Sequence, residues 1–138
     1  MASTQSTGRS RDFALLALRL VFGGMMLTHG IPKLMGFAEN SDSFPDPLGV
    51  GSPVAMALAI FAEVVCAGLV VVGAFTRLAV IPLMTTMIVA AFIVHAADPL
   101  AKKELALLYL TAYAALGLMG AGRFSIDAKL PARFAKLK

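Results

Sequence analysis

The chain of 138 residues has few charged residues, one cysteine and no tryptophan. Only 14% of its residues are charged and 59% are hydrophobic, whereas a soluble domain has about 25% charged and about 45–50% apolar residues. The mean hydropathy of +0.83 excludes both a water-soluble single domain and a disordered chain. The single cysteine, Cys66, excludes an intramolecular disulfide and a metal site built on a cysteine pair.

Four apolar runs are long enough to cross a bilayer, which takes about 20 residues of helix. They cover residues 13–35, 53–75, 78–97 and 103–121 and predict an all-α, four-helix transmembrane bundle that forms a single membrane domain. The first run is too long for a cleaved signal peptide and contains Arg19, so we expect an uncleaved span. Thr76 and Arg77 are expected to join the second and third spans in a tight hairpin. A short polar N-terminal tail, a loop at residues 36–52 and a basic C-terminal tail complete the domain.

The distribution of basic residues predicts the orientation of these spans. One side of the membrane would hold most of the lysine and arginine residues, namely Arg9, Arg11, Arg77, Arg123, Lys129, Arg133, Lys136 and Lys138. The other side would hold Lys33, Lys102 and Lys103. Because basic residues stay on the cytoplasmic side, both termini should be cytoplasmic in a multi-pass protein of the bacterial inner membrane. The basic residues behind the net charge of +4 would then set the orientation of the spans and contact anionic lipids. No nucleic-acid partner is expected.

Ionisable residues inside the spans mark the candidate site, because each costs about 2.5–3.5 kcal/mol near the bilayer centre. The ligand-pocket candidates are Arg19, His29, Lys33, Glu63 and His95. Helical spacing places the first three on one face of the first span, beside glycines that let a neighbouring helix approach. Glu63 lies in a row of small residues, with Ala55, Ala59 and Ala67. We expect Arg19 and Glu63 to form a buried ion pair, which would make both charges tolerable.

Near the outer ends of the spans the sequence predicts a polar crown, formed by His29, Lys33, His95, Asp98 and Glu104. Such a group could bind a metal, relay protons or hydrogen-bond a quinone or another small polar headgroup. His29 and His95 are weak metal candidates, since no close histidine or cysteine spacing supports a site, and no metal is assigned. Purely structural roles stay open as well, including lipid-phosphate contacts for Lys33 and Arg77.

Three stretches of the chain resemble motifs of the DoxX family of small bacterial membrane proteins. Residues 18–34 contain Arg19 and Gly23 followed by His29-Gly30 and Lys33-Leu34, as in the first family motif. Residues 63–77 begin with Glu63 and end in Thr76-Arg77, which is similar to the second. Residues 120–127, Gly-Ala-Gly-Arg-Phe-Ser-Ile-Asp, resemble the closing motif, with alanine where proline is common. Together the resemblance covers about residues 13–128.

The resemblance implies a four-helix inner-membrane bundle with Arg19, His29, Lys33 and Glu63 as its polar core. A related subunit belongs to an archaeal thiosulfate:quinone oxidoreductase, and other members are linked to thiol, oxidative-stress or copper systems. The function expected is therefore an accessory subunit of a membrane redox system, with a pocket for a quinone-like or small thiol or oxyanion ligand. The chain has no nucleotide, haem or flavin motif, so electrons would come from a ligand or from soluble redox partner subunits.

Two alternatives remain open at this point. The chain could be a non-catalytic scaffold that anchors soluble redox enzymes, or a carrier of a small solute or metal ion. No cofactor is assigned, although a quinone would be compatible with the sequence. The sequence also leaves open whether the chain is itself an enzyme. The small-residue helix faces would also suit a homo-oligomer.

Overall fold

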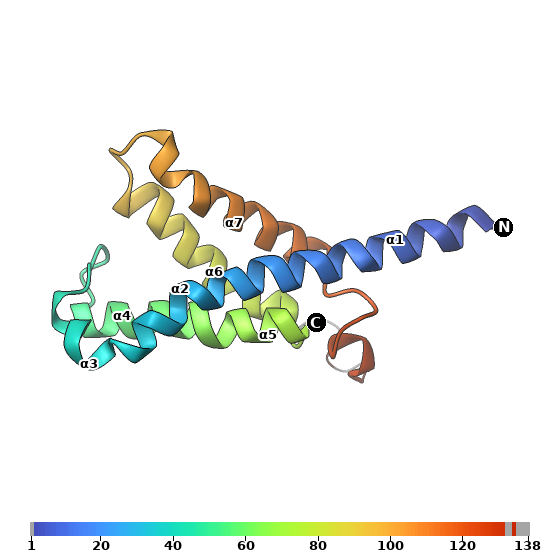
Figure 1. The fold of residues 1–138 in the computed structure, drawn as a ribbon, viewed down its shortest axis with the longest axis horizontal. Helices are drawn as coiled ribbons and strands as arrows, with labels where there is room; N and C mark the ends of the chain where they lie inside the picture. The colour runs from blue at the N-terminus through green and yellow to red at the C-terminus, as the bar shows by residue number, and fades with distance from the viewer. Residues whose placement is uncertain (1, 132–133, 135–138) are drawn as a thin grey trace.

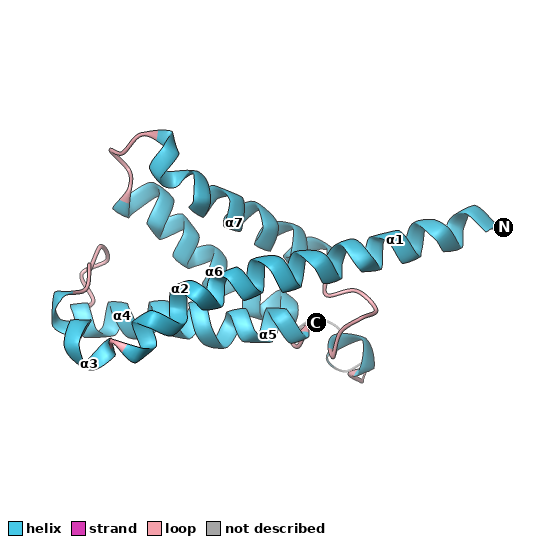
Figure 2. Ribbon diagram, viewed as in Figure 1, coloured by secondary structure: helices cyan, strands magenta, loops and turns pink. Residues whose placement is uncertain are grey.

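The structure, a computed structural model, describes residues 2–131 and 134 and is helical with connecting loops there (Figure 2). The first long helix consists of α1 (Ala2–Leu18), the π-helical segment η1 (Arg19–Gly23) and α2 (Gly24–Met35). The second consists of α4 (Ser52–Ile60), the π-helical η3 (Phe61–Cys66) and α5 (Ala67–Val72). The third is α6 (Thr76–Val89) with the π-helical η4 (Ala90–Val94), and the fourth is α7 (Leu100–Met119). Short helices α3 (Phe37–Asn40), η2 (Ser41–Ser43) and η5 (Asp127–Lys129) lie in the connections.

The long helices form a bundle from which α1 projects, so that the N-terminus lies well away from the other helices (Figure 1). Helices α6 and α7 form an antiparallel hairpin that packs against the first two long helices. The hairpin diverges from them toward the end of the bundle that carries α3 (Figure 1). The core contains aliphatic and aromatic side chains from all four long helices, including Leu15, Val70, Leu83 and Tyr113.

Three helices in the described part of the chain are long and apolar enough to cross a membrane: Gly8–Met35, Ser52–Val72 and Thr76–Val94. Helix α7 is similar in length, but its first turns carry Lys102, Lys103 and Glu104. Large apolar side chains on the outside of the bundle, such as Leu58, Ile81 and Phe92, are more than half exposed. An apolar exterior suits contact with lipid, and the fold is that of an all-α, multi-pass membrane protein. The cytoplasmic position of the termini stays a prediction, and Arg133, Lys136 and Lys138 lie outside the described residues.

The turn between the second and third helices differs from the sequence-based expectation. The second helix ends at Val72, because Gly73 adopts the left-handed conformation (φ 70°) that ends many helices. Thr76 and Arg77, predicted as the connection, are the first residues of α6. The turn is thus Gly73–Phe75, and Phe75 itself has φ 47°, a strained value for a residue with a bulky side chain.

Two glycines allow the first two long helices to approach each other closely. A Cβ atom on Gly30 would lie 2.8 Å from the carbonyl oxygen of Glu63, and one on Gly23 would lie 2.7 Å from Val71 Cγ2. Only a residue without a side chain fits at such distances. The predicted close approach of a neighbouring helix to this face is therefore confirmed, and it brings α2 directly against the backbone of Glu63.

Candidate functional site

The predicted ion pair between Arg19 and Glu63 is wrong. Arg19 is 2% exposed and donates hydrogen bonds to four backbone carbonyls: Val70 (3.1 Å), Val71 (3.0 Å), Ala121 (2.8 Å) and Phe124 (2.8 Å). Two of these carbonyls lie at the C-terminal end of α5, where the helix dipole favours a cation. Arg19 therefore finds its partners at the end of α5 and in the segment that follows α7, and Glu63 has a different partner.

Asp127 completes this arrangement, which we call the clasp (Arg19, Asp127 and the carbonyls that Arg19 binds). The Asp127 carboxylate accepts hydrogen bonds from the backbone N–H groups of Phe75 (2.6 Å) and Thr76 (2.9 Å). It thereby satisfies N–H groups at the start of α6 and holds Phe75 in its left-handed conformation. The clasp fastens residues 121–127 to the turn between α5 and α6, so its chemistry is structural.

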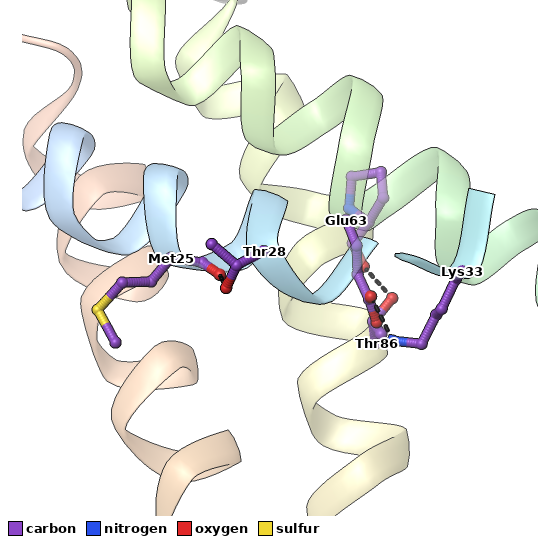
Figure 3. Close-up of polar contacts among 6 residues, drawn as sticks. Met25, Thr28, Lys33, Glu63 and Thr86 are labelled. Carbon is purple, nitrogen blue, oxygen red and sulfur yellow. Dashed lines mark hydrogen bonds and ion pairs between the residues drawn. The ribbon is translucent and has the colours of Figure 1, made fainter. Parts of the chain in front are cut away.

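Glu63 pairs with Lys33. The Lys33 ammonium group donates to Glu63 Oε2, and the two side chains point toward one another from α2 and η3 (Figure 3). The Glu63 side chain is 6% exposed and that of Lys33 is 30% exposed. Lys33 thus supplies the cation that a buried carboxylate needs, and the alternative contact of Lys33 with lipid phosphate stays a prediction.

The polar residues coincide with π-helical turns. Arg19 begins η1, Glu63 lies inside η3, and η4 ends directly before His95. A π-helical turn adds one residue to the helical turn and rotates the side chains that follow, and such turns are frequent at functional sites. Arg19 and Lys33 both meet the second long helix, but at positions seven or more residues apart along it, Val70 and Val71 for Arg19 and Glu63 for Lys33.

Four of the five candidate residues, His29, Lys33, Glu63 and His95, line one polar cavity of about 270 Å³. Two further polar residues that line this cavity, Lys102 and Tyr109, were not among the candidates. They are seven residues apart on α7, and this spacing puts them on one face of the helix. The spacing is visible in the sequence and could have indicated that the two residues line the same site. Arg19 belongs to the clasp and does not line the polar cavity.

An apolar groove of about 620 Å³ adjoins the polar cavity. Its walls come from α4, η3, α6 and η4, and the loop at residues 44–50 contributes Phe44, Pro45, Pro47, Leu48 and Val50. The groove and the cavity share Lys33, Glu63, Ala90 and His95. The ion pair therefore lies where a polar chamber meets an apolar one.

The rest of the predicted polar crown is only partly assembled. The His95 imidazole and the Asp98 carboxylate are hydrogen-bonded at 2.7 Å, and Lys102 lies 3.9 Å from Asp98. The hydrogen bond with His95, followed by the nearby lysines, lowers the pKa of Asp98. Glu104 lines neither the polar cavity nor the groove. Within residues 2–131 and 134, no three His, Cys, Asp or Glu side chains gather as metal ligands would.

Comparison with known proteins gives one family and one relative. The chain matches the DoxX family over residues 14–96. It is also similar to an uncharacterized protein of Haemophilus influenzae (strain ATCC 51907 / DSM 11121 / KW20 / Rd), at 32% identity over 126 residues, which covers 86% of this chain and 92% of that protein. No solved structure matches the chain. The family match includes all five candidate residues and ends before Tyr109 and the clasp residues that follow it.

Proposed function

The chain belongs to the DoxX family, and from this premise we propose that it binds a quinone-like ligand between its helices and serves as an accessory membrane subunit of a redox system. The observation that carries the proposal is the junction of the polar cavity and the apolar groove at the Lys33–Glu63 pair. An isoprenoid quinone has a polar ring and an apolar tail, and the two chambers match these two parts in character.

The residues around the junction fit such a ligand. The groove is lined mostly by aliphatic and aromatic side chains, which suits a hydrocarbon tail. The polar cavity offers hydrogen-bonding side chains from three helices, including His29, His95 and Tyr109. When bound, a quinone would supply the electron chemistry, while the chain would bind and orient it. The accessory role rests on the absence of nucleotide, haem and flavin motifs noted in the sequence.

The test compares two matched alanines of α4. Ala59 lines the groove, whereas Ala57 is exposed and lines neither chamber. The chain contains two tyrosines and no tryptophan; Tyr109 lines the polar cavity and stacks on Tyr113. Quenching of their fluorescence by decylubiquinone in detergent micelles therefore reports binding directly at the site.

We expect the wild type and Ala57→Phe to bind decylubiquinone with similar affinity and Ala59→Phe to bind at least about tenfold more weakly, because the phenyl ring fills the groove. Membranes from cells that lack the chain should show slower quinone reduction with thiosulfate or a small thiol as donor. Wild type should restore the rate and Ala59→Phe should not. Wild-type protein that does not bind the quinone, or equal rescue by Ala59→Phe, would overturn the proposal. Co-purification of soluble redox enzymes that is unaffected by Ala59→Phe would instead favour the scaffold.

A further inference from the structure

A buried tyrosine of α7, Tyr109, lines the polar cavity. Tyr109 is 1% exposed, yet its hydroxyl has no hydrogen-bond partner among the described residues. Burying a hydroxyl without a partner costs about 1–3 kcal/mol, so an unpaired one calls for an explanation. Tyr109 lines the polar cavity and lies within electrostatic reach of the Glu63 carboxylate.

Aromatic packing holds the Tyr109 ring in place. The rings of Phe22 and His29 meet it edge to face, with centroids 5.6 Å and 6.1 Å away, and the ring of Tyr113 stacks at 5.9 Å. Contacts on several sides leave the ring little freedom to turn its hydroxyl to a new partner within the protein. The neighbouring Tyr113 differs in this respect, because its hydroxyl donates to the Phe22 carbonyl oxygen at 3.2 Å.

The charges around the polar cavity balance. Lys33 is paired with Glu63, and Lys102 and His95 both lie beside Asp98. An anionic ligand would find its cations already engaged, and it would lie close to the Glu63 carboxylate. An uncharged group with a hydrogen-bond acceptor meets neither obstacle.

We infer that the Tyr109 hydroxyl is the headgroup donor of this site, and that the ligand is an uncharged amphiphile whose head presents a carbonyl oxygen to Tyr109. This inference rests on the proposed function and sharpens it, since it selects the quinone-like ligand over the small oxyanion. The carbonyl accepts the hydrogen bond that the Tyr109 hydroxyl does not make inside the protein, while the tail occupies the apolar groove. Tyr109 binds and positions the head, and it takes no part in electron transfer.

The test compares Tyr109→Phe with the matched control Tyr113→Phe, each of which removes one hydroxyl from the same pair of stacked rings. We expect Tyr109→Phe to weaken decylubiquinone binding about 5- to 20-fold, as the loss of one hydrogen bond does, and Tyr113→Phe to change it less than about threefold. Difference infrared spectra with ¹³C-labelled quinone carbonyls should show a downshifted carbonyl band in wild type. That shift should be lost only in Tyr109→Phe.

A second measurement uses the protein without added ligand. Tyr109→Phe removes an unpaired buried hydroxyl and should leave the thermal unfolding midpoint unchanged or raised, whereas Tyr113→Phe breaks a hydrogen bond and should lower it. Equal quinone affinity in wild type and Tyr109→Phe, with wild type still binding, would overturn the role of Tyr109 and leave the proposed function standing. Binding of thiosulfate in preference to decylubiquinone would overturn the uncharged ligand. Wild-type protein that binds no quinone would refute both proposals.

Discussion

Replacing Arg19 with methionine should remove the hydrogen bonds of the clasp and destabilise the whole bundle. The guanidinium group donates to four carbonyls that come from two separate parts of the chain, α5 and the segment after α7. Methionine fills a similar volume and donates no hydrogen bond, so the substitution isolates the lost donors from a loss of packing.

The expected cost follows from what each carbonyl retains. Val70 keeps a hydrogen bond from the Gly73 N–H at 3.1 Å. Val71, Ala121 and Phe124 have no other donor to their carbonyl oxygens among the described residues. Leaving a buried polar group without a partner costs about 1–3 kcal/mol. Three such carbonyls should therefore lower the free energy of unfolding by about 3–9 kcal/mol, toward the lower end because the Val71 and Phe124 contacts are only partly buried.

Unfolding in mixed micelles of rising SDS content, followed by circular dichroism, measures this change. Arg77→Met is the matched control. Among the described residues, exposed Arg77 donates to a single carbonyl, that of Leu118 at 3.2 Å, so this substitution should cost less than about 1 kcal/mol. Hydrogen exchange adds a local readout: the Asp127 N–H, which donates to the Gly73 carbonyl at 2.8 Å, should exchange faster in Arg19→Met.

Two results would refute this account of the clasp. One is a loss of stability in Arg19→Met no larger than that in Arg77→Met. The other is recovery of stability when Glu63→Leu is added to Arg19→Met, since that recovery would mean that Arg19 and Glu63 interact after all. The structure predicts that these two substitutions are additive, because the two residues have separate partners.

Glu63→Ala should lower the free energy of unfolding by about 3–5 kcal/mol in the same SDS titration, because it leaves Lys33 unpaired. Lys33→Met combined with Glu63→Leu should recover most of this lost stability, and additive effects of the two substitutions would contradict the pairing. Gly30→Ala should cost about 1–3 kcal/mol, because its Cβ atom would lie 2.8 Å from the Glu63 carbonyl oxygen, while Gly68→Ala, with open space at its Cβ position, should be neutral or slightly stabilising; equal thermal midpoints for the two would disagree with this packing. A reporter fused to the C-terminus should read cytoplasmic and one inserted at Asp42 periplasmic, as the distribution of basic residues predicts, and opposite signals would reverse the orientation.

The amino-acid sequence by itself determined the class of the protein, because hydropathy is a local property. Long apolar runs with few charges require helices in a membrane, and the motif order is sufficient to indicate the family. It also identified the buried ionisable residues as unusual, since a charge in a span is costly wherever the span lies. Gly30 correctly indicated a close contact between two helices, because a side chain at this position would collide with the backbone of Glu63.

Only the tertiary structure decided which of these residues meet. The partner of Glu63 depends on how α2 is positioned along the axis of the second long helix, and no local sequence pattern encodes that position. The segment after α7 supplied two of the four carbonyls for Arg19 from more than 100 residues away. The unpaired Tyr109 hydroxyl is also a property of the tertiary structure, because whether a buried donor is satisfied depends on every neighbour that the fold brings to it.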